Sequence, residues 1–207
     1  MRPRAVALDV DGVLTYFKSA WQRLHKILGV NAEINRALYY AGYIDYVEWA
    51  IADVELWRGV PRHMAEARFT PRHGFDELCS TLAKMGALRI AISAGVGYTR
   101  QLSKCFDEFL VNDLIYRGNA VDGVEVVVTN TNKGDVLRSV LSKYGISPDE
   151  AIAVGDSETD IPLFRIAGFS IAFNPTSEAV ARAANVVIRS HSLTPLAKYL
   201  RAITANS

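Results

Sequence analysis

The chain has 207 residues, of which half are hydrophobic and 22% are charged. This composition is typical of a globular protein and excludes disorder over most of the length. Lysine and arginine number 23 against 22 for aspartate and glutamate, so the formal net charge is +1. Such a balance gives no electrostatic reason to expect a nucleic-acid partner. At this length we expect one large domain, or one domain with a small insert.

The two cysteines, Cys79 and Cys105, are too few for a disulfide framework or a cysteine-based metal cluster, and they fit a reducing compartment. The apolar residues 5–8 are followed by Asp9, far short of a signal-peptide core. No stretch approaches the ~18 apolar residues of a membrane span. We therefore expect a cytoplasmic protein with no membrane partner.

Short apolar runs, typical of strands buried on both faces, recur along the chain. They cover residues 5–8, 88–92, 151–154, 169–173 and 186–188. Helical patterns lie between the later runs, at residues 135–144, 161–167 and 177–184. This alternation predicts an α/β fold with a parallel sheet and crossover helices. A turn signal at Asp122-Gly123, followed by residues 124–128, predicts a hairpin arm.

Residues 16–71 interrupt the alternation, because they contain no convincing strand. All three tryptophans lie there, and apolar side chains repeat at helical spacing, as in the set Val47, Ile51 and Val54. This segment is predicted to be a small helical insert. The core is then expected to comprise residues 1–15 and 72–207.

Acidic residues follow two of the predicted strands. Asp9 and Asp11 lie at the end of the first strand, where extended chain points both carboxylates to the same side. Asp156 and Asp160 follow the strand at 151–154. Either group by itself could cap a helix. If the two strand ends meet, four carboxylates gather and need a cation, and an all-oxygen ligand set favours Mg²⁺. The candidate metal ligands are therefore Asp9, Asp11, Asp156 and Asp160.

Two further elements fit an anion site. Ser93, Ala94 and Gly95 follow the strand at 88–92, where a small hydroxyl residue, a glycine and a helix start can bind a phosphate-sized anion. Lys133 lies at a predicted helix start, near the positive end of the helix dipole, which suggests a compensating anion. The alternatives are an ordinary serine N-cap and a solvated lysine.

Together and in this order, the four elements resemble the motifs of the haloacid dehalogenase superfamily of phosphohydrolases. Residues 9–15 match the pattern D-x-D-G-x-[LT], Ser93 the second motif, Lys133 the third, and residues 155–160 the pattern G-D-x-x-x-D. The helical insert resembles the cap of the C1 subclass, and the whole pattern is similar to phosphoserine phosphatases. The resemblance implies a Rossmann-like core, a Mg²⁺ cofactor and a small phosphorylated metabolite as substrate.

The resemblance also implies a mechanism. Asp9 would attack phosphorus and form an aspartyl-phosphate, while Asp11 would protonate the leaving oxygen and later activate water. Lys133 and Ser93, with backbone N–H groups after Ser93, would hold phosphate oxygens. Mg²⁺ would be bound by Asp9, the backbone carbonyl of Asp11 and Asp156.

The insert departs from the phosphoserine phosphatase pattern. Those enzymes bind the serine through an acid shortly after the first motif and an arginine on a cap helix. Here Lys18 and Asp53 occupy the two positions, so both charges are reversed. Lys18 and Asp53 are candidate substrate-binding residues, although Asp53 could equally be a surface acid. The alternatives to a general phosphatase are a phosphoserine phosphatase proper, a phosphomutase, or a non-catalytic phosphometabolite-binding protein.

Overall fold

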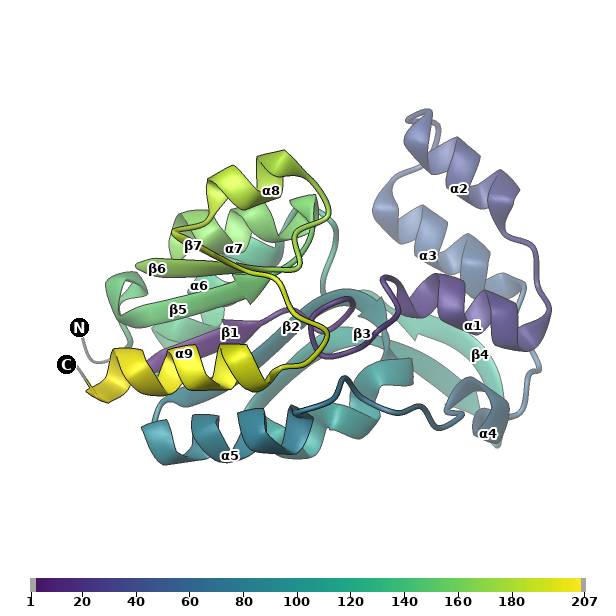
Figure 1. The fold of residues 1–207 in the computed structure, drawn as a ribbon. Coiled ribbons are helices and arrows are strands. Elements are labelled where there is room, and N and C mark those ends of the chain that lie inside the picture. Colours follow the sequence, from purple (N-terminus) through teal and green to yellow (C-terminus); the bar gives the residue numbers. More distant parts are fainter. Residues whose placement is uncertain (1–2, 206–207) are drawn as a thin grey trace.

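The computed structural model describes residues 3–205, which form an α/β fold around one seven-stranded sheet (Figure 1). The strand order is β4-β3-β2-β1-β5-β6-β7, and all neighbours are parallel except β3 and β4. The strands are β1 (Ala5–Leu8), β2 (Leu88–Val96), β3 (Glu108–Arg117), β4 (Ala120–Glu125), β5 (Ala151–Gly155), β6 (Phe169–Phe173) and β7 (Val186–Ile188). The predicted fold class is confirmed.

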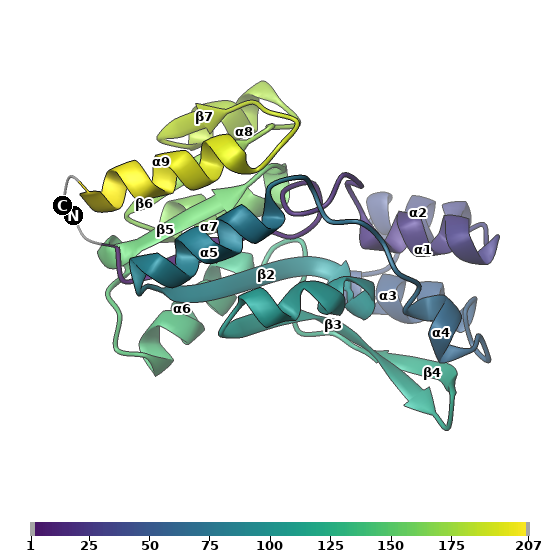
Figure 2. The same cartoon turned by 60° about the horizontal axis from the view of Figure 1, so that its bottom comes forward.

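Alternating side chains of the central strands build two hydrophobic layers. Val6 and Leu8 of β1 face α5 (Phe75–Met85), α9 (Thr194–Ala205) and the 3₁₀ segment η1 (Gly97–Cys105). Ala5 and Ala7 face α6 (Lys133–Lys143), α7 (Ile161–Ile166) and α8 (Glu178–Ala183). The helices therefore cover both faces of the sheet (Figures 1 and 2), as a parallel sheet requires.

Four helices lie between β1 and α5, and their apolar side chains pack with residues of β2, η1 and β4 in a third hydrophobic cluster. They are α1 (Ala20–Leu28), α2 (Glu33–Tyr40), α3 (Tyr46–Glu55) and α4 (Arg62–Ala65). Helices α1, α2 and α3 stand beyond the carboxyl end of β1, the edge at which open parallel sheets bind ligands (Figure 1). The helical content expected for this segment is present.

The side chains expected to form one face of the insert do not all do so. Val54 is buried, but Val47 and Ile51 are 41% and 49% exposed. The buried face of α3 instead contains Tyr46, Ala50 and Asp53, together with Val54. The prediction from apolar spacing was therefore wrong for Val47 and Ile51. The buried face of α3 includes the carboxylate of Asp53, which has its own hydrogen-bond partners.

The hairpin differs from its prediction. Its strands are β3 and β4, and they turn at residues 118–119, so Asp122 and Gly123 lie inside β4 rather than at the turn. Residues 126–128 lie beyond the strand. Strand β3 was not expected, because Asn112 and Asp113 interrupt its apolar run. Asn112 is nevertheless fully buried, since both ends of its amide are hydrogen-bonded.

The cysteine count gave no reason to expect a disulfide, yet Cys79 and Cys105 are joined. Their Cα atoms lie 5.5 Å apart. The bond links α5 to the end of η1 on one face of the sheet. Within residues 3–205, no helix is long and apolar enough to cross a membrane.

Candidate active site

A buried ammonium group joins two carboxylates at the carboxyl edge of the sheet. Nζ of Lys133, the first residue of α6, donates to Oδ1 of Asp9 at 2.7 Å and to Oδ1 of Asp160 at 2.6 Å. All three side chains are at most 4% exposed. Burial by itself would lower the pKa of Lys133, but the two carboxylates outweigh it and raise the pKa, so the ammonium stays charged. The lysine is therefore part of the site and not a solvated surface residue.

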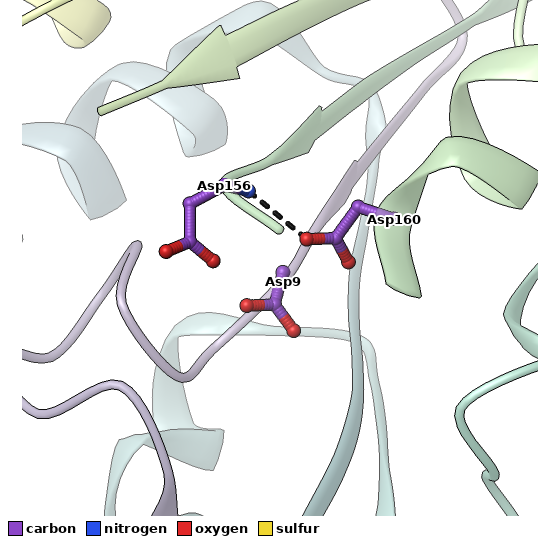
Figure 3. Close-up of side chains that lie close together, drawn as sticks. All are labelled: Asp9, Asp156 and Asp160. Carbon is purple, nitrogen blue, oxygen red and sulfur yellow. Dashed lines mark hydrogen bonds between the residues drawn. The ribbon is translucent and has the colours of Figure 1, made fainter. Parts of the chain in front are cut away.

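Asp9 lies just beyond β1, at the centre of this group. The pKa of its carboxyl is raised by burial and by the neighbouring charge of Asp160. The hydrogen bonds among the described residues use only Oδ1 of Asp9, so Oδ2 has no donor. Figure 3 shows the carboxyl groups of Asp9, Asp156 and Asp160 facing a common space, and one oxygen from each lies within 4.8 Å of the others. The predicted meeting of the two strand ends is thus present in the fold.

Asp160 uses both of its oxygens to organise the loop after β5. Oδ1 accepts from Lys133, and Oδ2 accepts from the backbone N–H of Asp156 and Ser157 and from the Ser157 hydroxyl. A Cβ on Gly155 would lie 2.3 Å from the Cβ of Asp160, so this approach needs a glycine. Both oxygens of Asp160 are therefore engaged by donors, which suits a positioning role better than metal ligation.

Asp11 stands apart from the three-carboxylate group. Its Oδ2 accepts from the backbone N–H of Ala20 at the start of α1, at 2.7 Å. Its Oδ1 is buried and has no hydrogen-bond partner within residues 3–205. Burial raises the pKa of Asp11 to about 7. A carboxyl group with this pKa and one unpartnered oxygen can both donate and accept a proton near neutrality.

Asp156 forms an ion pair that crosses the loop after β1. Nζ of Lys18 contacts Oδ2 of Asp156, whose side chain is 2% exposed, whereas that of Lys18 is 49% exposed. Burial and the charge of Asp160 raise the pKa of Asp156 to about 6. Gly12, at φ +85°, leaves room for this pair, because a Cβ there would lie 2.3 Å from Oδ2 of Asp156.

The predicted phosphate site lies in a bulged strand and not, as expected, between a strand end and a helix start. Ser93, Ala94 and Gly95 lie inside β2, which continues to Val96, and η1 starts only at Gly97. The pairing of β2 with β3 shifts register between Ile92 and Val96, so the segment bulges out of the ladder. A bulge frees backbone N–H groups from strand pairing. The Ser93 hydroxyl accepts from the N–H of Gly95 at 2.9 Å.

Three side chains hold the carbonyl of Ala94, which fixes the bulge. Trp21 of α1 donates through Nε1 at 3.0 Å, and Asn112 of β3 donates through Nδ2 at 3.1 Å. The Tyr46 hydroxyl of α3 donates to the same oxygen. Two of these donors come from the helical insert, so the insert is coupled to the bulge that contains the predicted phosphate site. Sequence reasoning missed these anchors, because no local pattern links them.

A cavity of about 700 Å³ lies above these groups. Its lining includes Asp9, Asp11, Ser93 and Lys133 of the core, and side chains of the insert: Lys18, Trp21, His25, Lys26, Arg36, Tyr46, Trp49 and Asp53. The volume lies within the range of small-molecule sites. Ala94 and Gly95 also line it. The cavity therefore brings together the residues that the sequence predicted for catalysis and for substrate binding.

Asp53 is 2% exposed and belongs to a buried hydrogen-bond chain in the cavity wall. Its Oδ2 contacts Nε2 of His25 at 2.9 Å, and its Oδ1 accepts from Nδ2 of Asn35 at 3.0 Å. Nε1 of Trp57 donates to Nδ1 of His25 at 3.1 Å. Because Nδ1 accepts, the ring proton lies on Nε2 and is donated to Asp53. Asp53 is thus not a surface acid.

Arg72 is a further residue of the site that sequence reasoning missed. Its guanidinium is buried and donates to the backbone carbonyls of Gly12, Val13 and Thr15, each at 2.8 Å. These carbonyls belong to the loop that follows Asp9 and Asp11. Burial lowers the pKa of Arg72. The only signal in the sequence was a charged residue directly after Pro71, at the expected end of the insert.

The donor set of the site fits a hard divalent cation. Of the three buried carboxylates, those of Asp9 and Asp160 share the buried ammonium of Lys133, and that of Asp156 pairs with the half-exposed ammonium of Lys18. Three carboxylates thus face two ammonium groups, so negative charge is in excess. The ligand atoms on offer are all oxygens, which Mg²⁺ prefers. The carboxylates of Asp9 and Asp156 are the groups best placed to hold such an ion.

Comparisons with known proteins agree with this geometry. A model of the haloacid dehalogenase-like hydrolases matches residues 67–200. Phosphoserine phosphatase of Methanocaldococcus jannaschii is 25% identical over 97% of this chain and 99% of its own. That of Archaeoglobus fulgidus is 28% identical over 96% of this chain, which spans 60% of that relative. The solved structure of a phospho-aspartyl intermediate analogue of phosphoserine phosphatase has a TM-score of 0.78 at 23% identity, over 96% of this chain and 99% of that one.

The family match covers more than half of the chain, so this protein belongs to the haloacid dehalogenase-like hydrolase family. Within the family it is similar to phosphoserine phosphatases in sequence and in fold. The resemblance expected from the four motifs is confirmed.

Proposed function

We propose that this protein is a Mg²⁺-dependent phosphatase that hydrolyses a small phosphomonoester metabolite through an aspartyl-phosphate intermediate. The observation that carries the proposal is that two carboxyl groups with different surroundings line one cavity. Asp9 has one oxygen held by Lys133 and one free, and Asp11 has a raised pKa and an unpartnered oxygen. These properties support Asp9 as the nucleophile and Asp11 as the proton carrier.

In the first step, Oδ2 of Asp9 attacks phosphorus and the bond from phosphorus to the ester oxygen breaks. Asp11 in its acid form donates its proton to that leaving oxygen, so an alcohol departs. Lys133 keeps Oδ1 of Asp9 in place and offers positive charge to the phosphoryl oxygens. Ser93 and the N–H groups of the β2 bulge bind the remaining oxygens.

In the second step, Asp11 is a carboxylate and takes a proton from water. The water oxygen attacks phosphorus, the bond to Asp9 breaks, and inorganic phosphate is released. Asp9 returns as a carboxylate and Asp11 as an acid, so the cycle closes without another reactant. A pKa of about 7 for Asp11 suits both directions of proton transfer.

Asp9 and Asp156, with the backbone carbonyl of Asp11, would hold Mg²⁺. When bound, the ion would supply positive charge that lets a carboxylate approach an anionic phosphate ester. We assign Asp160 to the positioning of Lys133 and of the loop at residues 155–157, because both of its oxygens are already used.

We propose that residues 16–71 act as a cap on a core of residues 1–15 and 72–207. Tyr46 and Trp21 of the cap contact the phosphate site directly, so cap position and phosphate binding depend on each other. The substrate's leaving group would lie against the cap wall that contains Asp53. A buried carboxylate in this wall disfavours a substrate carboxylate beside it, so phosphoserine is not expected to be preferred over other small phosphomonoesters.

A cytoplasmic location stays a prediction. The Cys79–Cys105 disulfide is a type of bond that is uncommon in reducing compartments.

The test is phosphate release from p-nitrophenyl phosphate, with Mg²⁺ and with EDTA, by the wild type, Asp9→Asn and Asp76→Asn. Asp76 is an exposed acid on α5 and serves as the matched control. Activity that requires Mg²⁺, disappears in Asp9→Asn and persists in Asp76→Asn supports the proposal. Activity that survives in Asp9→Asn would exclude Asp9 as the nucleophile.

A substrate panel then separates the alternatives. Hydrolysis of phosphoserine far faster than of sugar phosphates or other esters would make this a phosphoserine phosphatase proper. Transfer of the phosphoryl group to a sugar phosphate rather than to water would indicate a phosphomutase. A wild type that binds phosphate esters without hydrolysing them would be a binding protein.

A further inference from the structure

Lys18 is the only lysine within residues 3–205 that pairs with Asp156. Its backbone belongs to the segment between β1 and α1, and its side chain extends over Gly12 to reach the carboxylate. A Cβ on Gly12 would lie 2.9 Å from Cδ of Lys18, so the lysine stem runs close to the glycine backbone. The contact is specific, because it depends on a glycine at one position and a lysine six residues later.

The two partners differ in their surroundings. The side chain of Asp156 is 2% exposed, so the surrounding atoms leave it little room to move, and its backbone N–H is held by Oδ2 of Asp160. The side chain of Lys18 is 49% exposed and also lines the substrate cavity. The ammonium can therefore leave the carboxylate and enter the cavity by rotation of its own side chain.

A metal ion bound to Asp156 competes with this ammonium. Mg²⁺ lies about 2.1 Å from its oxygen ligands, so it would be a close neighbour of any cation on the same carboxylate. Repulsion between the two cations is weakly screened at a buried group. The flexible, half-exposed partner is the one that can move.

We propose that Lys18 is an internal counter-ion of Asp156 that Mg²⁺ displaces into the substrate cavity. In the metal-free protein the ammonium offsets part of the excess negative charge of the site. After metal binding it faces the cavity, where its charge becomes available to an anionic substrate. Lys18 thereby couples metal loading to substrate binding as a positioning residue. This inference rests on the proposed function, because it assumes that Asp156 is a metal ligand.

The first test is amine labelling followed at residue resolution by mass spectrometry. The wild type is labelled with an acetylating reagent in EDTA and in saturating Mg²⁺ at matched ionic strength. Labelling of Lys18 is expected to increase with Mg²⁺, because a released amine reacts faster than a paired one. Lys26 is the internal control, since it is exposed, lines the same cavity and has no ion pair within residues 3–205.

The second test is Mg²⁺ binding measured by calorimetry without substrate. Lys18→Met is expected to bind Mg²⁺ more tightly by roughly 5-fold or more, the lower range of coupling between sites. Lys18→Arg, which keeps a cation at this position, and Lys26→Met, which removes one elsewhere in the cavity, are expected to bind as the wild type does. Comparison of these variants separates the displacement of the Lys18 ammonium from a general repulsion between Mg²⁺ and the cationic side chains of the cavity.

The outcomes separate this inference from the proposed function. If the wild type binds Mg²⁺ but the labelling of Lys18 stays unchanged or decreases, the displacement is wrong while the metal site stands. Equal or weaker Mg²⁺ binding by Lys18→Met overturns it as well. Absence of Mg²⁺ binding to the wild type overturns the metal site and this inference together.

Discussion

Replacement of Arg72 by methionine tests whether the loop that follows Asp9 and Asp11 depends on one buried guanidinium. Methionine keeps an unbranched apolar stem but is shorter than arginine and has no N–H donors. The variant therefore removes the hydrogen bonds to the carbonyls of Gly12, Val13 and Thr15. Those three carbonyls then stay buried without their donor.

The expected loss follows from the hydrogen bonds. A hydrogen bond to a charged group contributes about 1.5 kcal/mol at the lower end of its range, so three of them correspond to about 4–5 kcal/mol. For a chain of this size, each kcal/mol lowers the melting temperature by about 2–4 °C. A decrease of about 10 °C or more is therefore expected. Catalysis should suffer even where the variant is folded, because the loop also fixes Asp9 and Asp11.

The assay is urea unfolding followed by tryptophan fluorescence, with phosphate release measured well below the unfolding transition. Arg68→Met is the control, since Arg68 is an exposed arginine four residues earlier. It should change the free energy of unfolding by less than about 0.5 kcal/mol. If Arg72→Met unfolds within about 1 kcal/mol of the wild type, the carbonyls find other donors and the reasoning is refuted.

Three further perturbations have defined outcomes. In EDTA, the pKa of Asp11 at about 7 lies above its ordinary 3.8, so the free energy of unfolding should fall as pH rises from about 4 to about 7. If urea titrations show that the free energy of unfolding rises over this pH range, the raised pKa of Asp11 is contradicted. Reduction of the Cys79–Cys105 bond, which spans 26 residues, should lower the free energy of unfolding by about 3.5 kcal/mol, and equal stability with and without dithiothreitol would contradict this. Gly12→Ala should abolish Mg²⁺ binding by calorimetry, because its Cβ meets a site carboxylate at 2.3 Å. Gly29→Ala, with φ +67° and open space, should lose only about 1–2 kcal/mol of stability; equal Mg²⁺ binding by both variants would refute the steric argument.

The α/β class and the order of the site residues could be predicted from the sequence, because each depends on local pattern. A strand that is buried on both faces has a short, continuous run of apolar residues in the sequence. The runs at β1 and β5 were recognisable for that reason. The polar residues that follow them must have particular types for the chemistry, so Asp9, Lys133 and Asp156 stood out. Strand β3 did not, because Asn112 is buried through contacts with distant residues and looks polar in the sequence.

Only the tertiary structure decided how these residues are used. Asp160 bonds to Lys133 across 27 positions, and Lys18 reaches Asp156 across 138. Arg72 supports a loop nearly 60 residues earlier in the chain. The energy of a hydrogen bond or ion pair depends on distance in space and on burial, and periodicity along the chain records neither. The sequence therefore determined which chemical groups are present at the sheet edge, and the packing of the insert against the core determined which of them meet.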